Sequence, residues 1–327
     1  MDADDRSLTP EDAASLLNQV LSRLETLVLG QRFALERLVI ALLADGHVLL
    51  EGPPGLAKTR TVRALAQSLD LPFRRIQFTP DLLPADLTGS EIFRPALGDF
   101  VARPGPIFAS VLLADEINRA PAKVQSALLE AMQERQVTIG ERSLPLPDPF
   151  WVLATQNPIE HEGVYPLPEA QLDRFLFKLE IGYPDRDAEL AILDLPDDGD
   201  GVGSHEPILD QATVRRLRQA RSRVHVAAAI KEYVVDLVRA TRDFSLIQAP
   251  KSPGFAWGAS PRAALSWKRA AQARALSQGR DYVVPHDVKS LARETLCHRV
   301  VIDDEAEAQG LTAESLIARI LDRVRVP

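Results

Sequence analysis

The chain has 327 residues, of which 46% are hydrophobic, 26% charged and 6% aromatic. This composition is that of a globular protein, so it excludes a disordered or fibrous chain, and the length predicts two domains. The formal net charge of −8 argues against a protein that coats nucleic acid. With a single cysteine, no basic N-terminal leader and no apolar run long enough to span a bilayer, we expect a cytoplasmic protein.

The first predicted elements are a flexible N-terminus and a helix. Residues 1–10 are mostly acidic or polar, so we expect them to be flexible. Thr9, Pro10 and Glu11 then form a typical helix start. The threonine can cap, proline suits the first helical position, and a carboxylate faces the positive end of the helix dipole. Apolar residues recur at helical spacing over 16–27, which predicts a helix with one buried face.

Between residues 11 and 193, short apolar runs alternate with helical stretches. The five apolar runs cover residues 47–50, 75–78, 111–114, 151–154 and 175–181. Runs of this length are typical of strands buried on both faces, as in a parallel sheet. Helical stretches lie between them, notably 60–69 and 121–134. We therefore predict an α/β core with a five-stranded parallel sheet flanked by helices.

The strongest motif follows the first run, where an apolar strand leads into a glycine-rich loop and a helix. Gly52 and Gly55 allow a tight loop whose backbone N–H groups can cradle phosphates at the helix N-terminus. Lys58 can neutralise the β- and γ-phosphates, and the Thr59 hydroxyl can bind Mg²⁺. The expected phosphate-binding residues are Gly52, Pro53, Pro54, Gly55, Leu56, Ala57, Lys58, Thr59 and Arg60. The usual P-loop has glycine directly before the lysine, whereas this chain has Ala57, so this motif alone leaves a chance strand–turn–helix open.

Two later apolar runs end in polar residues that suit the same chemistry. Asp115 and Glu116 follow the third run. Beside a P-loop, Asp115 can hold Mg²⁺ directly or through water, and Glu116 can orient and polarise the attacking water. Acids in this position also serve as helix caps. Asn157 follows the fourth run and can contact the water or the γ-phosphate, with a turn-forming Asn before Pro158 as the simpler alternative.

The rest of the chain is expected to form a linker, a helical domain and two hairpins. Residues 194–210 are rich in Asp, Gly and Pro and predict an exposed linker. Residues 211–327 have helical periodicity and almost no strand pattern, so we predict a small all-α domain. Within the core, an insertion at about 84–106 contains a hairpin at 92–103, and residues 136–145 predict a second one. Either hairpin could face a pore or a partner, or be an inert surface ribbon.

Other polar residues give weaker signals. The six histidines lack metal-ligand spacing, so we expect no zinc site. Cys297 lies among helical apolar positions and is expected to be a core residue. One basic cluster has no interleaved aromatic residues and indicates a solvated helix face rather than a nucleic-acid groove. Its members are Arg215, Arg216, Arg218, Arg221 and Arg223.

Together these motifs resemble those of the MoxR family of AAA+ ATPases, and the resemblance extends from about Leu29 to the C-terminus. The matching segments are Gly52-Pro-Pro-Gly-Leu-Ala-Lys-Thr59, Asp115-Glu-Ile-Asn-Arg-Ala-Pro121, Ala154-Thr-Gln-Asn-Pro158, Leu167-Pro-Glu-Ala-Gln-Leu-Asp-Arg-Phe175 and Gly258-Ala-Ser-Pro-Arg262. Ala57 matches a variant of the P-loop found in that family. The resemblance implies a P-loop AAA+ core and an all-α lid, with the insertion at 84–106 marking the wider clade that includes the replicative helicases.

The resemblance also implies roles for single residues. Gly30 and Gln31 match the segment that lies beside the adenine. Arg174 matches the arginine finger, which reaches the γ-phosphate of a neighbouring subunit and neutralises charge on the transferring phosphoryl group. Arg262 matches the second sensor, carried on the lid so that nucleotide binding couples the two domains. The simpler alternatives are an ion pair of Arg174 with Asp173, Asp185 or Asp187 and an ordinary surface position for Arg262.

In functional terms the resemblance implies a chaperone-like ATPase that binds ATP and Mg²⁺ and works as a homo-oligomeric ring, a hexamer. It also implies a partner with a von Willebrand factor A domain and a client enzyme complex, which the protein remodels or matures, in some cases by metal or cofactor insertion. Two alternatives stay open: a nucleic-acid motor of the same clade, and a nucleotide-gated scaffold with a silent site. The acidic charge and the missing DNA-binding domain argue against the first. Against the second stands the intact set of Lys58, Asp115, Glu116, Asn157 and Arg174.

Overall fold

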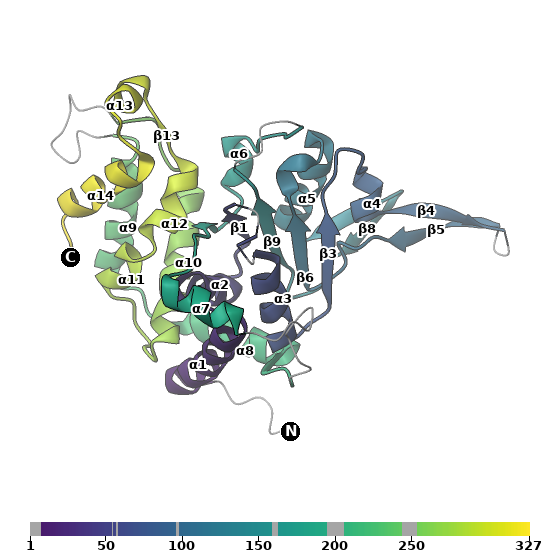
Figure 1. Ribbon diagram of the computed structural model, residues 1–327, viewed down its shortest axis with the longest axis horizontal. Helices are drawn as coiled ribbons and strands as arrows, with labels where there is room; N and C mark the ends of the chain where they lie inside the picture. Colours follow the sequence, from purple (N-terminus) through teal and green to yellow (C-terminus); the bar gives the residue numbers. More distant parts are fainter. Residues whose placement is uncertain are drawn as a thin grey trace.

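A five-stranded parallel sheet forms the centre of the first half of the chain (Figure 1). The computed structural model describes residues 8–53, 55–56, 58–95, 98–158, 163–194, 206–243 and 254–327. The strands lie in the order β10-β1-β9-β6-β3, and each neighbouring pair is parallel. Their bounds are β1 (Val48–Glu51), β3 (Phe73–Gln77), β6 (Val111–Asp115), β9 (Trp151–Gln156) and β10 (Phe177–Glu180). All five predicted strands are present, and the predicted α/β class is confirmed.

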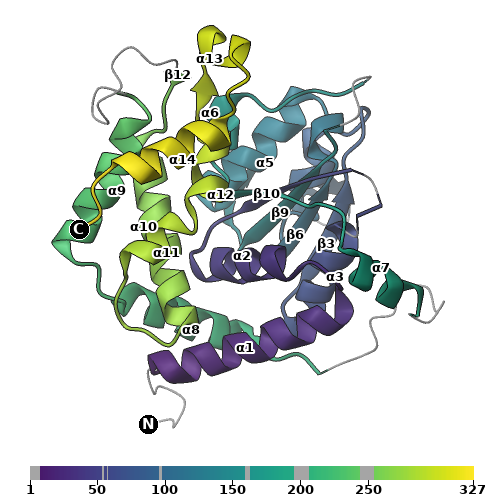
Figure 2. The ribbon, with the colours of Figure 1, turned by 60° about the vertical axis from the view of Figure 1, so that its left-hand side comes forward.

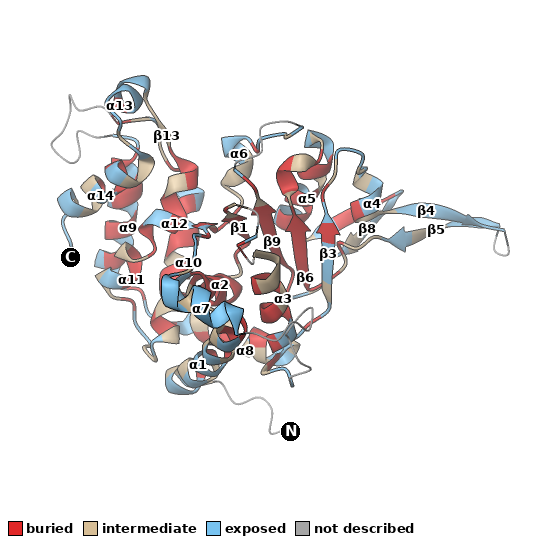
Figure 3. Ribbon diagram, viewed as in Figure 1, coloured by how far each residue is buried: buried red, intermediate tan, exposed pale blue. Residues whose placement is uncertain are grey.

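Helices cover both faces of this sheet. In the first half they are α1 (Pro10–Leu27), α2 (Arg32–Leu43), α3 (Lys58–Ser68), α4 (Pro84–Thr88) and α5 (Ala122–Glu134). Leu113 and Leu153 pack in the hydrophobic layer that contains α1, α2 and α3. Their chain neighbours Leu112 and Val152 point the other way, into the layer that contains α5. Because both faces of β6 and β9 are buried (Figure 3), these strands are continuous apolar runs rather than alternating ones.

Residues 211–327 are mainly helical (Figure 2). The helices after β9 are α6 (Glu169–Leu172), α7 (Arg186–Leu193), α8 (Gln211–Arg223), α9 (Ala228–Ala240), α10 (Pro261–Ser277), α11 (Pro285–Lys289), α12 (Ala292–Leu296), α13 (Asp304–Ala308) and α14 (Ala313–Arg323). Short 3₁₀ turns lie at Ile117–Arg119, after β6, and at Cys297–Arg299, after α12. Among the residues that the structure describes, no helix has both the length and the apolar character that crossing a membrane requires.

Two short strand pairs were not predicted. They are β2 (Leu69–Asp70) with β11 (Leu209–Asp210), and β12 (Phe255–Trp257) with β13 (Val301–Ile302). Strands of two or three residues are too short to give a period-two pattern, so sequence reasoning missed them. Because β11 pairs with β2, the end of the expected linker is joined to the core. Residues 195–205 of that linker lie outside the described residues.

The first helix begins as predicted and connects the two halves of the chain. The Thr9 hydroxyl accepts a hydrogen bond from the Asp12 N–H at 3.1 Å, and Pro10 lies in the first turn. α1 packs against α2 and α3 and also against α8 and α10 from the second half. The N-terminal helix is therefore part of the contact between the core and the later helices.

Both predicted hairpins are present. The first consists of β4 (Gly89–Arg94) and β5 (Asp99–Pro104), and it projects from the body of the molecule (Figure 1). Two exposed phenylalanine rings near its tip have centroids 5.3 Å apart. The second hairpin consists of β7 (Gln136–Ile139) and β8 (Arg142–Pro145).

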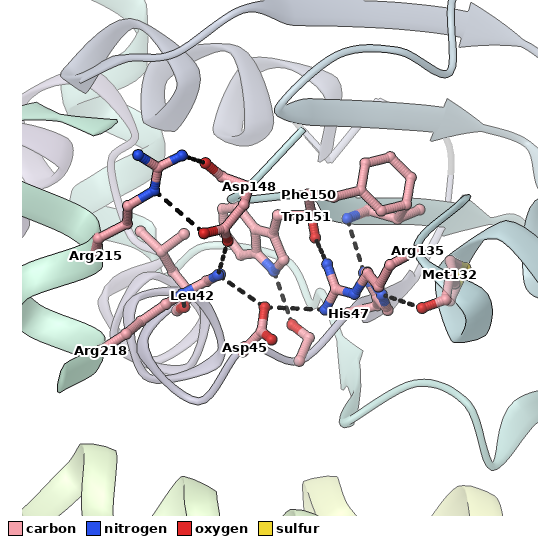
Figure 4. Close-up of polar contacts among 12 residues, drawn as sticks. Leu42, Asp45, His47, Met132, Arg135, Asp148, Phe150, Trp151, Arg215 and Arg218 are labelled. Atoms are coloured by element: carbon pink, nitrogen blue, oxygen red, sulfur yellow. Dashed lines mark hydrogen bonds and ion pairs between the residues drawn. The ribbon is translucent and has the colours of Figure 1, made fainter. Parts of the chain in front are cut away.

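The basic cluster on α8 is joined to the core, as Figure 4 shows. Arg218 donates from Nε to the Leu42 carbonyl at 3.0 Å and pairs with Asp45 at 2.8 Å, and its side chain is only 11% exposed. Arg215 pairs with Asp148 at 3.2 Å. The expectation of a solvated helix face is therefore wrong for Arg218. The Leu42 carbonyl, in the last turn of α2, also accepts a long hydrogen bond from the Asp45 N–H at 3.3 Å, and the Asp45 carboxylate adds a counter-charge for Arg218.

Replacing Arg218 with alanine should lower the free energy of unfolding by about 2–3 kcal/mol. The Leu42 carbonyl would lose its charged donor, and Asp45 would lose one of its two arginine partners. Urea unfolding followed by circular dichroism measures the difference. Arg223→Ala, at an exposed position on the same helix, is the matched control and should cost less than about 0.5 kcal/mol. Equally small effects for both variants would contradict a structural role for Arg218.

Two buried histidines, His47 and His298, are held neutral. His47 Nδ1 accepts from the Val152 N–H at 3.0 Å, and Nε2 donates to the Met132 carbonyl (Figure 4). His298 Nε2 donates to the Phe175 carbonyl at 3.0 Å. Burial lowers the pKa of both rings well below 6.5, and nearby arginines lower it further.

Acid should therefore destabilise the fold. As the pH falls below about 6.5, the unfolded chain takes up a proton on each histidine while the folded chain does not, so stability is lost. Two such groups give a slope of at most about 2.7 kcal/mol per pH unit. His298→Gln should reduce that slope by about half in urea unfolding between pH 7.5 and 5.5. Burial raises the pKa of Glu294, so protonation of this carboxyl stabilises the fold as the pH falls. Because Glu294 is present in both the wild type and His298→Gln, the difference between their slopes reports on His298 alone. If the free energy of unfolding falls with pH equally in the wild type and in His298→Gln, His298 does not cause the acid destabilisation.

Candidate functional site

The glycine-rich loop lies between β1 and α3, at the carboxyl end of the sheet. A Cβ atom at Gly52 would lie 2.5 Å from the carbonyl oxygen of Ile181, so only glycine fits there. Gly55 has a φ of +84°, which also favours glycine. The other described residues of the predicted loop and first helical turn are Pro53, Leu56, Lys58, Thr59 and Arg60. Pro54 and Ala57 lie outside the described residues.

The first two residues of α3 face the strand ends. Lys58 Nζ donates to the Gly52 carbonyl and, at 3.2 Å, to the Gln156 carbonyl. The ammonium group therefore lies between the ends of β1 and β9. Thr59 Oγ1 donates to Asp115 Oδ2 at 3.2 Å. The predicted lysine, threonine and aspartate thus meet at one edge of the sheet.

Asp115 ends β6 and is held from both sides. Arg75 on β3 donates to Oδ2 from its terminal nitrogen at 2.8 Å and from Nε at 3.0 Å. Thr155 on β9 donates to Oδ1 at 2.5 Å. The aspartate side chain is 8% exposed. Sequence reasoning missed Arg75 and Thr155 because they become neighbours of Asp115 only through the strand order.

Glu116 follows in a left-handed backbone conformation, with φ 57° and ψ 51°. This conformation costs a residue other than glycine roughly 1–2 kcal/mol, and such strain is concentrated at functional sites. The Glu116 N–H donates to Thr155 Oγ1 at 2.9 Å. Its carboxylate accepts from Gln77 Nε2 at 2.6 Å and pairs with Arg119 at 3.2 Å. The turn therefore gives the adjacent carboxylates of Asp115 and Glu116 different partners. Sequence reasoning did not identify the Glu116 partners, Gln77 and Arg119.

Asn157 follows β9 and is buried beside another asparagine. Asn118 Nδ2 donates to the Asn157 carbonyl at 3.4 Å. Asn118 Oδ1 and Gln156 Oε1 are buried acceptors with no hydrogen-bond partner among the described residues. Buried acceptors without partners are rare, and they suit a site that binds water or an ion.

The donor set fits a complex of ATP with Mg²⁺. Mg²⁺ prefers hard oxygen ligands, and the Thr59 hydroxyl and the Asp115 carboxylate place two of them 3.2 Å apart. The N-terminus of α3 and the Lys58 ammonium supply positive charge for phosphates. A Cβ at Gly55 would meet open space, so a ligand can approach the loop backbone there. The unpaired acceptors nearby are consistent with ordered water around such a complex.

The predicted adenine segment lies against α7. Gly30 has a φ of +74°, and a Cβ there would be 2.7 Å from the Pro184 side chain and 2.9 Å from the Ala188 side chain. Gln31 Nε2 donates to the Gly182 carbonyl at 3.0 Å. The segment expected to contact the base is therefore positioned by the residues that follow β10.

Arg174 and Arg262 lie together in a pocket of about 370 Å³ at the other edge of the sheet, where the strands begin. Arg269 on α10 and His47, which precedes β1, also line this pocket. His47 and Gly52 are five residues apart along an extended strand, which separates the pocket from the phosphate loop by about 16 Å. The structure therefore brings Arg262 together with Arg174 and not with the phosphate loop of its own chain.

The aspartates considered as partners of Arg174 are engaged elsewhere. Asp173 pairs with Arg299 at 2.7 Å. Asp185 caps α7, and Asp187 is exposed and lies 3.9 Å from an arginine of its own helix. Within the described part of the chain, neither Arg174 nor Arg262 forms an ion pair with a carboxylate. Both guanidinium groups can therefore bind an anion supplied from outside the chain.

Comparisons with known proteins agree with this geometry. Residues 47–177 match the ATPase family associated with various cellular activities (AAA), and residues 248–320 match the AAA lid domain. The chain is 47% identical to Chaperone MoxR1 of Mycobacterium tuberculosis, over 95% of this chain and 82% of that protein. It is 32% identical to Protein MoxR of Methylorubrum extorquens, over 97% of this chain and 96% of that protein. It is also similar to the crystal structure of a Cytophaga hutchinsonii protein described as a candidate ATPase, with a TM-score of 0.90 and 43% identity over 97% of both chains.

Proposed function

The chain belongs to the MoxR family of AAA+ ATPases, and on this basis we propose that it binds ATP with Mg²⁺, hydrolyses it to ADP and phosphate, and thereby remodels or matures a protein complex. One observation carries the proposal: Lys58, Thr59, Asp115 and Glu116 converge at the carboxyl end of one parallel sheet. Ligands of open α/β sheets bind at this end.

The proposed roles follow from the chemistry of each group. Bound Mg²⁺ would neutralise charge on the β- and γ-phosphates. Thr59 and Asp115 supply hydroxyl and carboxylate oxygens for the ion, and Lys58 holds the phosphates. Glu116 orients and polarises the attacking water, and Asn157 contacts the water or the γ-phosphate from the opposite side.

We assign the pocket arginines to the active site of a neighbouring subunit. The pocket that holds Arg174 and Arg262 lies at the opposite edge of the sheet from the phosphate loop of the same chain, about 16 Å away along β1. A guanidinium group from a neighbour can neutralise charge on the transferring phosphoryl group. In a head-to-tail contact each subunit presents its arginine pocket to the phosphate loop of the next, and such contacts form a ring when the rotation between neighbours closes. We therefore propose a homo-oligomeric ring, a hexamer.

The relatives support the chaperone-like part of the proposal. MoxR1 of Mycobacterium tuberculosis is named a chaperone. We extend this to a client enzyme complex and to a partner with a von Willebrand factor A domain, with metal or cofactor insertion as one form of maturation. The alternative of a nucleic-acid motor loses support, because the Arg218 side chain is bound within the fold and the net charge is −8.

The proposal is tested by ATP turnover and by capture in the ATP-bound state. Wild-type protein should release phosphate from ATP, whereas Lys58→Ala should not, because the phosphates lose their cation. Glu116→Gln held in ATP should capture a von Willebrand factor A protein or an enzyme complex from native lysate, with Lys58→Ala as the control. Capture of nuclease-sensitive DNA would instead support the nucleic-acid motor. Full cellular function of Lys58→Ala would support the silent scaffold.

A further inference from the structure

The short helix α7 has no buried residue, yet it carries large apolar side chains. Leu193 is 81% exposed, and Tyr183, which precedes the helix, is 74% exposed. Leu190 and Ile192 are exposed as well. A helix of eight residues is marginal by itself in water, and a cluster of exposed apolar side chains marks an interaction surface. These four side chains form what we name the α7 patch.

The position and charge of the α7 patch restrict what can cover it. The helix packs on Gly30 through Ala188, so it lies beside the segment expected to contact the base. Asp187, Glu189 and Asp194 are exposed on the same segment and outnumber the exposed Arg186, which makes the surroundings of the patch acidic on balance. A complementary surface would therefore combine apolar and basic side chains.

A surface of this kind includes the first turns of α10, which line the arginine pocket, and the end of β12, which precedes α10 in the chain. Trp257 on β12 is 76% exposed, and Leu265 on α10 is 64% exposed. Leu265 lines the pocket together with Arg262 and Arg269. We name these four side chains the lid patch. Figure 2 places α7 and the segment from β12 to α10 on opposite sides of the molecule, as a head-to-tail contact between copies of one chain requires.

We propose that the α7 patch of one subunit docks against the lid patch of the next subunit. The inference rests on the proposed ring, because the same contact would bring Arg174 and Arg262 of one subunit to the phosphate loop of its neighbour. The apolar side chains supply the buried centre of the contact, and the acidic residues of α7 face Arg269 of the lid patch. Through α7 the neighbour also supports the Gly30 segment, so the nucleotide site is completed from outside at both the base and the phosphates.

Assembly of Glu116→Gln in ATP, measured by sedimentation, tests the contact. On this background, Leu190→Ser/Leu193→Ser should weaken subunit association at least about tenfold, because the leucines lose their apolar partner. Trp257→Ala should weaken association to a similar extent. Val235→Ser, another exposed aliphatic position, is the matched control and should leave association unchanged. Circular dichroism checks that every variant is folded.

Disulfide cross-linking tests the direction of the contact. In a Cys297→Ser background, Leu193→Cys mixed with Leu265→Cys should form cross-linked dimers in ATP, and neither variant alone should do so. Cross-linking of Leu193→Cys with itself would indicate a two-fold contact and would overturn the proposal. An assembled mixture that forms no cross-link would overturn it as well.

Failure of this contact can be told apart from failure of the proposed ring. If the wild type and Glu116→Gln stay monomeric in ATP, the ring and the α7 contact are both wrong. If the ring forms and Arg174→Ala loses ATPase activity, but the Leu190→Ser/Leu193→Ser variant assembles like the Val235→Ser control, only the α7 contact is wrong.

Discussion

Replacing Glu116 with glutamine should lower kcat about a hundredfold or more while ATP still binds. Glutamine cannot accept a proton from the attacking water, and the loss of a general base costs about 10²–10⁴ in rate. The amide has nearly the shape of the carboxylate, so the contact with Gln77 can persist through the amide oxygen. Phosphate release gives kcat, and a fluorescent ATP analogue gives Kd.

The same substitution at another glutamate shows whether the fall in kcat is specific to Glu116 or follows from the loss of any negative charge. Glu141, in the turn of the second hairpin, is exposed, and Glu141→Gln should keep the wild-type kcat. A wild-type kcat for Glu116→Gln would mean that another group activates the water. Loss of ATP binding in Glu116→Gln would mean that Glu116 holds the nucleotide rather than the water.

Replacing Arg174 with alanine should lower kcat about a thousandfold, because an arginine supplied in trans contributes about 10³–10⁵ to phosphoryl transfer. The free energy of unfolding should change by less than about 0.5 kcal/mol, since Arg174 forms no ion pair within the described part of the chain and lines an open pocket. Phosphate release and urea unfolding measure the two effects. Arg262→Ala, in the same pocket, should also lower kcat.

Mixing two inactive variants shows whether the arginine acts in trans. Lys58→Ala subunits cannot hold ATP but keep Arg174, whereas Arg174→Ala subunits hold ATP but lack the arginine. In a mixed ring, some junctions place an intact arginine opposite an intact phosphate loop, so ATPase activity should return in part. No recovery in rings shown to be mixed would contradict action in trans, and a wild-type rate for Arg174→Ala alone would exclude the arginine finger.

The five strands of the core sheet and the glycine-rich loop could be predicted from the sequence, because the signals for them are local. The helix start at Thr9 depends on residues within one turn. The buried strands β6 and β9 are recognisable as continuous apolar runs because both of their faces are covered. Asp115 and Glu116 could be placed near Lys58 since the carboxyl ends of parallel strands meet at one edge of a sheet.

Which side chains meet across the fold depends on how the elements pack, and this could not be predicted from the sequence. Arg75 and Thr155 bind Asp115 because β3 and β9 flank β6, and no single strand encodes that order. Arg218 is buried because α8 packs against the end of α2. Arg262 shares a pocket with Arg174 because α10 packs on α1 and α2 at the edge where the strands begin. Local patterns report which face of an element is apolar, whereas the packing of the whole core selects the element that covers that face.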